Sequence, residues 1–124
     1  MAGLTLDAGA LIAYERADPD ILQILRLAFR RGMSPTVPAV VLAEVWRGDR
    51  KDARVAWLLK ACTVEPLDEQ RARSAGKLRR TVAGAGAVDA CVAVGVRERG
   101  DALATSDPEN MRRLLGSGFR ILRV

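Results

Sequence analysis

The chain has 124 residues, of which 49% are hydrophobic and 28% are charged, a balance that fits one soluble globular domain over residues 1–124. No apolar run approaches the ~18 residues of a membrane-spanning helix. The first residues meet Asp7 at once and lack the basic segment of a signal peptide. Cys62 and Cys91 have no close cysteine neighbour, so we expect buried thiols, a reducing cytoplasmic location and no membrane partner.

The types of charged residue in the chain limit the kinds of active site and partner that we expect. Histidine is absent, which excludes histidine general bases, Ser–His triads and zinc sites of the Cys/His kind. The formal net charge is +5, and arginine supplies 17 of the 20 basic residues. Arginine forks suit phosphate recognition, so we expect RNA or another polyanion as a partner. A general preference for arginine codons is the alternative explanation.

Strands alternate with helices along the whole chain. In chain order the pattern predicts a strand over residues 4–6, helices over 8–16 and 19–31, a strand over 34–37, and helices over 38–47 and 51–60. It continues with a strand over 63–65, helices over 68–82 and 88–99, a strand over 102–105, a helix over 108–115 and a strand over 119–124. The charged helix over 68–82 should lie on the surface, and the apolar helix over 88–99 at the centre. This alternation predicts an α/β protein with a parallel sheet covered on both faces.

Four acids lie beside or within apolar runs: Asp7, Glu44, Asp89 and Asp107. Carboxylates at the edge of a core are costly unless they are paired, hydrogen-bonded or bound to a metal. Asp7 and Asp107 each follow a predicted strand, and the site of a parallel sheet lies beyond the carboxyl ends of its strands. We therefore predict a carboxylate cluster that holds Mg²⁺ or Mn²⁺ and performs phosphoryl chemistry.

Each of these acids has a purely structural alternative. Asp7, Asp89 and Asp107 each stand where a helix begins and could serve as its cap, and Glu44 could pair with Arg47 on an exposed edge. Thr105 and Ser106 are candidates for orienting the carboxylate of Asp107. Eight further acids stand among charged or turn residues and are expected to be solvated: Asp18, Asp20, Asp49, Asp52, Asp68, Glu69, Glu98 and Asp101.

Trp46 and Trp57 are two of only five aromatic residues. Packing in the core is the default expectation for both side chains. A partner interface is the alternative, because tryptophan is enriched in binding hot spots.

Four stretches, taken in order, make the chain resemble a PIN domain, and in particular a VapC-type toxin ribonuclease. They are Leu4–Ala13, Val41–Val45, Ala87–Ala93 and Leu103–Asp107. The resemblance implies a three-layer α/β/α sandwich, an endoribonuclease dependent on Mg²⁺ or Mn²⁺, a cognate antitoxin and toxin homodimers. It also implies that Asp7, Glu44, Asp89 and Asp107 form the catalytic, metal-binding quartet. The chain departs from many relatives at Gly9, where they carry Ser, Thr or Asn, so an accessory polar contact is either missing or supplied by another group, such as the backbone or Thr105.

The resulting hypothesis is metal-assisted hydrolysis of an RNA phosphodiester. Asp89 or Asp107 would orient the attacking water, and Arg47 and Arg112, chosen for their proximity to the motifs, would bind flanking phosphates. A non-catalytic PIN-like module that binds RNA or protein is the alternative. A phosphoacceptor receiver domain is disfavoured because Asp7 has no acidic neighbour, and a haloacid-type phosphatase because Gly9 occupies the position of its second Asp.

Overall fold

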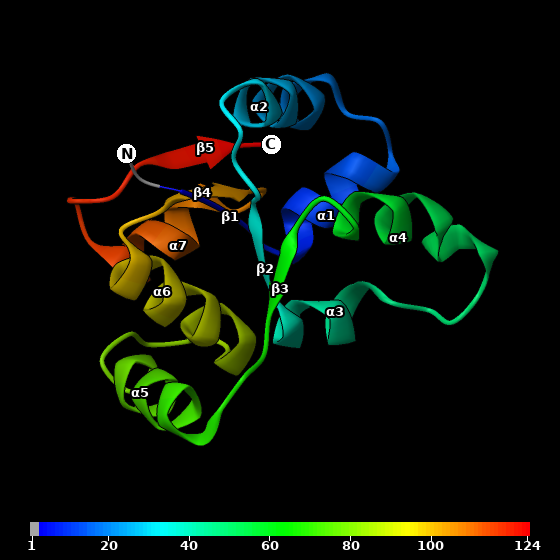
Figure 1. Cartoon of the computed structure of the whole chain (residues 1–124). Coiled ribbons are helices and arrows are strands. Elements are labelled where there is room, and N and C mark those ends of the chain that lie inside the picture. Colours follow the sequence, from blue (N-terminus) through cyan, green and yellow to red (C-terminus); the bar gives the residue numbers. More distant parts are fainter. Residues whose placement is uncertain (1–2) are drawn as a thin grey trace.

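A computed structural model describes residues 3–124 and contains one sheet of five parallel strands (Figure 1). The strands are β1 (Leu4–Leu6), β2 (Thr36–Pro38), β3 (Thr63–Glu65), β4 (Ala102–Thr105) and β5 (Ile121–Arg123), and their order is β3-β2-β1-β4-β5. The chain builds outward from β1 in one direction through β2 and β3, and then in the other through β4 and β5. The strand order therefore reverses between β1 and β4, the place where open α/β sheets bind ligands.

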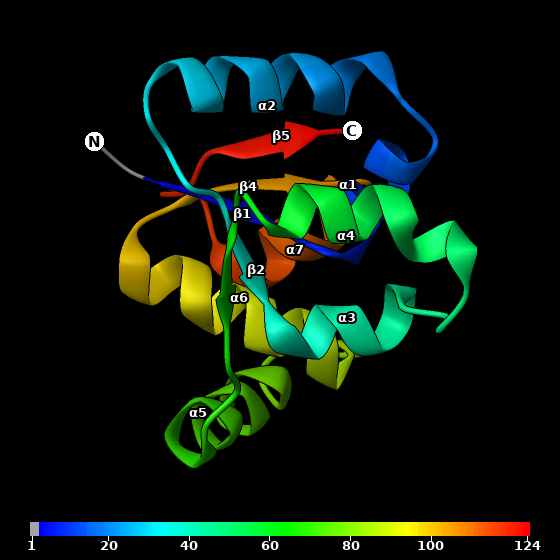
Figure 2. The ribbon, with the colours of Figure 1, turned by 45° about the vertical axis from the view of Figure 1, so that its right-hand side comes forward.

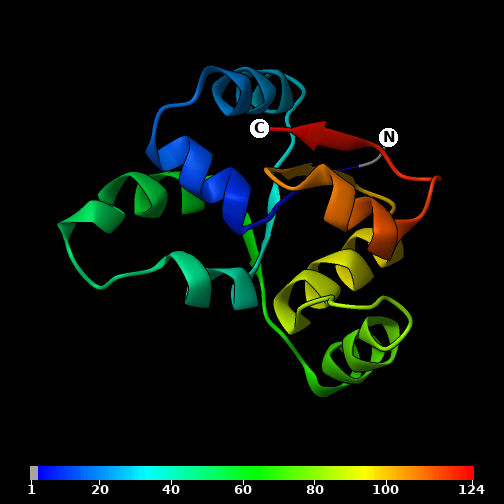
Figure 3. The same ribbon diagram turned by 180° about the vertical axis from the view of Figure 1, so that it is seen from behind.

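The helices form a layer on each side of the sheet, which confirms the α/β/α sandwich. One group gathers α1 (Ala8–Glu15), α2 (Pro19–Arg30), α3 (Ala39–Val45) and α4 (Ala53–Leu59), and the other gathers α5 (Glu69–Arg79), α6 (Ala87–Arg99) and α7 (Pro108–Leu115) (Figure 3). Helix α2 runs alongside β5 (Figure 2). None of the helices within residues 3–124 is both long and apolar enough to span a lipid bilayer.

Several element ends differ from the sequence-based prediction. The predicted helix over 38–47 ends at Val45, and a short 3-10 helix (Arg50–Asp52) precedes α4. The carboxylate of Asp52 accepts the backbone N–H groups of residues 47, 48 and 49, so these donors are diverted from a continued helix. Helix α5 ends three residues early, and β5 is three residues shorter than predicted.

Helix α6 lies at the centre of its layer, as its apolar sequence predicts. Every residue from 90 to 96 is buried. Gly95 is required by its neighbours, because a Cβ there would lie 2.7 Å from Arg71 Nη1 and 2.9 Å from Arg99 Nη1. The missing side chain lets both guanidinium groups pack closely against the helix. The C-terminal half of α6 is thereby tied to α5 and to the sheet.

Two acids that were expected to be solvated are buried, so that prediction was wrong for them. Asp101 is 5% exposed and accepts hydrogen bonds from Thr5 Oγ1 at 2.7 Å and from Arg99 Nε at 2.8 Å. Asp52 is 4% exposed and binds the backbone N–H groups of the α3–α4 loop. Each of these carboxylates accepts several hydrogen bonds from protein donors, which explains its burial without a ligand.

The default expectation of core packing was wrong for both tryptophans. Trp46 is 47% exposed and Trp57 is 69% exposed. Cys62 is half-buried, Cys91 is buried, and both are free thiols. Burial raises the pKa of Cys62 to about 11, which favours the protonated thiol at neutral pH.

Candidate active site

Asp7 and Asp107 lie at the carboxyl ends of the adjacent strands β1 and β4. Each carboxylate caps the helix that follows it. Asp7 Oδ1 accepts the N–H of Ala10 at 3.0 Å, and Asp107 Oδ1 accepts the N–H of Asn110 at 3.3 Å. The capping alternative is therefore realised for both residues. A cap occupies one carboxylate oxygen, so it fixes the orientation of the acid and is compatible with a further role.

Thr105 connects these two acids. Its Oγ1 accepts the backbone N–H of Asp107 at 3.0 Å, and its hydroxyl lies near enough to the carboxylate of Asp7 to lower the pKa of that acid. Thr105 is fully buried at the end of β4, so the hydroxyl has a single fixed position. The sequence expectation assigned Thr105 to the orientation of Asp107, and the structure adds Asp7 to its contacts.

Asp89 approaches the same edge from the other helical layer. It is the third residue of α6, whose cap residue is Gly86, so the capping alternative for Asp89 was wrong. Asp89 Oδ2 accepts a hydrogen bond from Asn110 Nδ2 at 2.9 Å. Asn110 therefore binds Asp89 with its side chain and Asp107 with its backbone. Sequence reasoning missed Asn110, although its place three residues after a capping Asp was visible.

The electrostatics show that Asp7, Asp89 and Asp107, which we call the acidic edge, act on one another. Burial raises the pKa of Asp7 to about 6 and outweighs the opposing hydrogen bonds from Thr105 and the backbone, and the charge of Asp89 makes a smaller contribution in the same direction as burial. Burial and the charge of Asp107 also raise the pKa of Asp89, against the hydrogen bond from Asn110. Negative charge is thus costly at this edge without a cation.

Glu44 is not among the charges that raise the pKa of Asp7 or Asp89. Its side chain is exposed on α3. Across residues 3–124, no three acidic or cysteine side chains converge closely enough to enclose a metal ion in their present positions. The charges of three of the four predicted acids thus act on one another, and the quartet as a metal site stays a prediction.

The donor set of the acidic edge still fits a hard cation. Its available ligands are carboxylate oxygens, which Mg²⁺ and Mn²⁺ prefer. The raised pKa values of Asp7 and Asp89 reflect burial and like-charge repulsion, both of which a bound cation would offset. Asp7, Asp89 and Asp107 are the residues that could hold it, and their side chains would have to close together to do so.

The two arginines chosen as phosphate ligands have protein partners. The guanidinium of Arg47 forms a two-pronged ion pair with Glu15, with distances of 2.8 and 2.9 Å, which lowers the pKa of Glu15. Arg112 Nη1 donates to the carbonyl oxygens of Gly116 at 2.8 Å and Phe119 at 2.6 Å. Their role in substrate binding stays a prediction, and each would have to leave these contacts to bind a phosphate.

Ser106 fills the space that a side chain at position 9 would occupy. An ideal Cβ built on Gly9 would lie 2.1 Å from Ser106 Oγ and 3.0 Å from the backbone nitrogen of Ser106. Gly9 is thus required by the close approach of the β4–α7 turn to the start of α1. Ser106 is exposed as a residue, and its hydroxyl lies against Gly9.

The fold is a parallel α/β/α sandwich, and carboxylates lie beyond the ends of β1 and β4, where the strand order reverses. These two features define a class of α/β proteins with an acidic site at the strand ends. The chain belongs to the PIN-domain family, which it matches over residues 4–114. PIN domains are generally nucleases. No curated protein matches the chain by sequence.

Solved structures with the same fold cover nearly the whole chain. A chain of VapBC2 from Rickettsia felis, bound to a DNA fragment from its promoter, is 14% identical, with 98% of both chains covered and a TM-score of 0.76. DNA-bound VapBC from Salmonella typhimurium is 21% identical, covering 98% of this chain and 97% of that one, with a TM-score of 0.75. FitAcB from Neisseria gonorrhoeae is 16% identical, covering 96% of both chains, with a TM-score of 0.68. At these identities the similarity shows a shared fold.

Proposed function

We propose that the chain is a VapC-type PIN domain, a single unit over residues 1–124 that hydrolyses RNA phosphodiester bonds with Mg²⁺ or Mn²⁺. The observation that carries this proposal is the hydrogen-bonded, charge-coupled group of Asp7, Asp89 and Asp107 at the switch point of the sheet. The match to a family of nucleases and the basic net charge of +5 support a polyanionic substrate.

The residues divide the work as follows. Asp7 and Asp107 present carboxylates held in place by helix caps and by Thr105. Asn110 occupies Oδ2 of Asp89, which leaves Oδ1 to accept a hydrogen bond from the attacking water. A bound Mg²⁺ or Mn²⁺ would supply Lewis-acid stabilisation of the charge on the phosphate. Glu44 completes the quartet in this proposal by reaching the edge when the cation binds.

Cleavage of a small-RNA pool tests the proposal directly. The purified protein would be assayed with Mg²⁺, with Mn²⁺ and with EDTA, beside the variants Asp7→Asn and Asp89→Asn. Glu69→Gln is the matched control, because Glu69 is 76% exposed on α5 and Arg73 is its one ion-pair partner among residues 3–124. We expect discrete cuts that require the metal, survive in the control variant and disappear in both site variants. A folded, metal-loaded protein that makes no cuts would favour the non-catalytic binding module.

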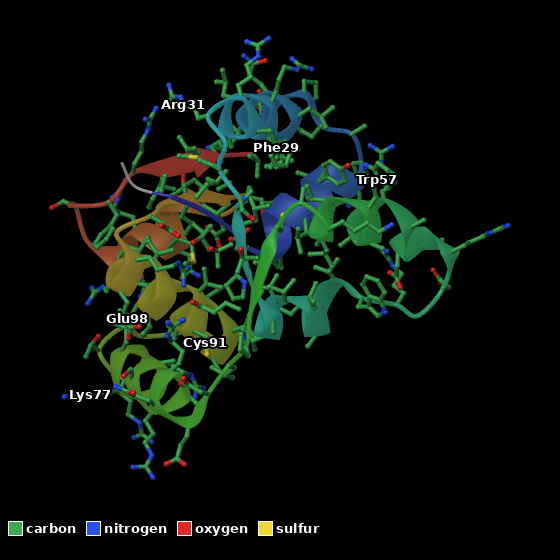
Figure 4. All side chains as sticks on the ribbon, viewed as in Figure 1. Phe29, Arg31, Trp57, Lys77, Cys91 and Glu98 are labelled. Atoms are coloured by element: carbon green, nitrogen blue, oxygen red, sulfur yellow. The ribbon has the colours of Figure 1, made fainter. Side chains whose placement is uncertain are left out.

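We also propose that the chain is the toxin of a pair and that an antitoxin covers an apolar groove beside α2. The similar structures carry the names of the two-component assemblies VapBC and FitAB. A groove of about 260 Å³ lies between α2 and α4, lined by Leu22 and Phe29 on one side and Trp57 and Leu58 on the other. Phe29 and Trp57 come from these two helices (Figure 4) and are 40% and 69% exposed. Large exposed aromatic side chains around a groove suit the apolar face of a partner helix.

Co-expression with the short reading frame expected beside this gene tests the pairing. Trp57→Ala should weaken the complex at least tenfold, because a buried aromatic anchor carries much of the affinity of an interface. Leu67→Ala is the control, since Leu67 is 43% exposed and lies outside the groove. Equal affinity for both variants would contradict the groove assignment. Toxin homodimers and a cytoplasmic location belong to the same proposal, and sedimentation of the free toxin and cell fractionation would test them.

A further inference from the structure

Trp46 is an exposed aromatic residue that the proposed site and the proposed groove do not explain. It is 47% exposed and follows directly on α3, the helix that carries Glu44. It does not line the groove between α2 and α4. Tryptophan is a large apolar side chain, so leaving half of it in water gives up part of its burial free energy. A ligand that covers the ring would recover that free energy.

The backbone on which Trp46 stands is held rigidly. The N–H of Trp46 donates to the carbonyl of Leu42 at 2.8 Å. On its other side, the carboxylate of Asp52 accepts the N–H groups of Arg47 at 3.0 Å and Gly48 at 2.6 Å. The hydrogen bonds with these N–H groups outweigh the effect of burial and lower the pKa of Asp52, so the carboxylate stays ionised. An aromatic ring on a fixed frame loses little freedom when it binds a flat partner.

The segment that follows Trp46, residues 47–54, presents positive charge to solvent. It holds four basic and two acidic residues. Asp52 is buried and binds its loop, whereas Asp49 is exposed and its Oδ1 accepts the N–H of Lys51 at 2.8 Å. The basic side chains of Arg50, Lys51 and Arg54 are exposed. An exposed aromatic ring and exposed basic side chains within one short segment are a combination that can bind single-stranded nucleic acid.

Trp46 lies within reach of the acidic edge. Helix α1 begins at the Asp7 cap and ends at Glu15, whose carboxylate holds the guanidinium of Arg47, the neighbour of Trp46. Eight helical residues span roughly 12 Å. A strand of RNA that passes Asp7 and follows α1 therefore meets the Trp46 ring within a few nucleotides.

We propose that Trp46 is a stacking platform for an unpaired base of the RNA substrate, with Arg50 and Lys51 binding the adjacent phosphates. This inference rests on the proposed ribonuclease function and adds a preference for single-stranded RNA. Every base has an aromatic face, so stacking tolerates any sequence, but the bases of a duplex already stack on one another and are closed to the ring.

Tryptophan fluorescence in EDTA, where no cleavage occurs, tests the platform. Trp57→Phe leaves Trp46 as the only tryptophan, and the reverse variant, Trp46→Phe, leaves only Trp57. Each would be titrated with a short single-stranded RNA and with the same RNA annealed to its complement. We expect saturable quenching of Trp46 by the single strand, much weaker quenching by the duplex, and little quenching of Trp57. Equal quenching by strand and duplex, or quenching of Trp57 alone, would overturn the proposal.

Affinity measurements separate this proposal from the proposed function. Trp46→Ala should weaken binding of the single strand about fivefold or more, the low end for loss of one stacked base. Leu27→Ala, which removes a side chain of similar exposure (43%) on α2, should leave the affinity unchanged.

Unchanged affinity and cleavage in Trp46→Ala would contradict the stacking platform and leave the proposed nuclease function intact. RNA binding that depends on Trp46 without any metal-dependent cleavage would sink the nuclease. Trp46→Ala that converts a dimer into monomers, with RNA affinity intact, would assign the ring to an interface between copies and overturn the platform.

Discussion

The side-chain amide of Asn110 donates a hydrogen bond of 2.9 Å to Oδ2 of Asp89, and the backbone N–H of the same residue is bound by Asp107. Asn110 thus stands between two acids from different helices. Its side-chain amide carries no charge and donates a hydrogen bond to Asp89. This hydrogen bond offsets part of the repulsion between the carboxylates. One neutral residue therefore lets two acids remain close without a cation.

Asn110→Asp should convert this support into repulsion. Without metal at pH 7.5, we expect the free energy of unfolding to fall by about 1–2 kcal/mol, because a donor to a carboxylate is lost and a like charge is gained. The loss should shrink when Mg²⁺ is added, since a cation offsets the added charge. Denaturant unfolding with EDTA and with Mg²⁺ would measure both values.

Gln70→Glu is the matched control for this substitution. Gln70 is exposed and lies in the first turn of α5, so the change from amide to acid meets a similar helix dipole. We expect a change within about 0.5 kcal/mol, independent of Mg²⁺. A metal-independent effect of Asn110→Asp would contradict a cation at the acidic edge.

The stability of the metal-free protein should decline as pH rises through the titration of Asp7. The pKa of Asp7 is raised from 3.8 to about 6, so between these values the folded state holds a proton that the unfolded chain has released. The free energy of unfolding therefore falls across this window and stays lower above it. Asp7→Asn keeps a capping side chain but cannot ionise. Relative to the native protein, this variant should gain up to about 3 kcal/mol between pH 4 and pH 7.

Unfolding in EDTA at several pH values would test this dependence. Parallel profiles for the native protein and Asp7→Asn would show that burial does not raise the pKa of Asp7. Addition of Mg²⁺ should stabilise the native protein more above pH 6 than below it, because the cation favours the ionised carboxylate. Asp7→Asn should lose most of that gain.

Gly9→Ser should be harmful because of one neighbour. The new Cβ would overlap Ser106 Oγ and press on its backbone nitrogen, so we expect a loss of about 1–3 kcal/mol in the free energy of unfolding. The exchange Gly9→Ser with Ser106→Gly removes the overlapping hydroxyl and should recover most of the loss. Thermal unfolding of the two single variants and the double variant gives this coupling directly.

Gly76→Ala provides the control for Gly9→Ser. Gly76 lies inside α5, and a Cβ there would meet nothing within 4 Å. This substitution should stabilise the protein by about 0.5–1 kcal/mol, as alanine does in an open helix interior. Additive effects at positions 9 and 106 would refute the shared space between Gly9 and Ser106.

The elements that the sequence predicts best are those whose periodicity and end signals agree. The strand over residues 4–6 and the helix at 108–115 have the predicted bounds, since an apolar run and a Pro after a capping Asp leave no competing structure. The end of α3 was missed because Asp52, a residue of the next helical segment, accepts hydrogen bonds from the loop. The periodicity of the residues within α3 gives no sign of this contact. Tertiary hydrogen bonding overrode local propensity there.

The candidate site was predictable where an acid follows a strand. Asp7 and Asp107 lie at the same edge because the parallel strands β1 and β4 both end there, and the chain order supplies that information. The position of Glu44 depends on the rotation of α3 and on its side-chain conformation, which the spacing of residues does not determine. Asn110 was missed because a single amide at the start of a helix has no pattern to distinguish it from a solvated one.

Asp101 shows the corresponding limit for buried charge. In sequence it stands between Gly100 and Ala102 beside arginines and has the appearance of a solvated turn residue. In the fold it accepts hydrogen bonds from Thr5, which lies 96 positions away, and from Arg99. A contact between distant segments of the chain decides whether this aspartate is buried or exposed. The residues next to it in the sequence do not reveal that contact.

Thr5→Val should reveal how much this contact contributes. Thr5 Oγ1 is fully buried, donates to Asp101 and accepts from Arg99 Nη2 at 2.8 Å. Valine keeps the shape and strand propensity of threonine but removes both hydrogen bonds, so Asp101 keeps Arg99 alone. We expect the free energy of unfolding to fall by about 1–3 kcal/mol, the cost of leaving buried polar groups without a partner.

Thr36→Val in β2 is the control, because Thr36 forms no side-chain hydrogen bond among residues 3–124. This substitution should change the free energy of unfolding by less than about 0.5 kcal/mol. Equal effects in chemical denaturation would mean that the Thr5 hydroxyl contributes nothing beyond its volume.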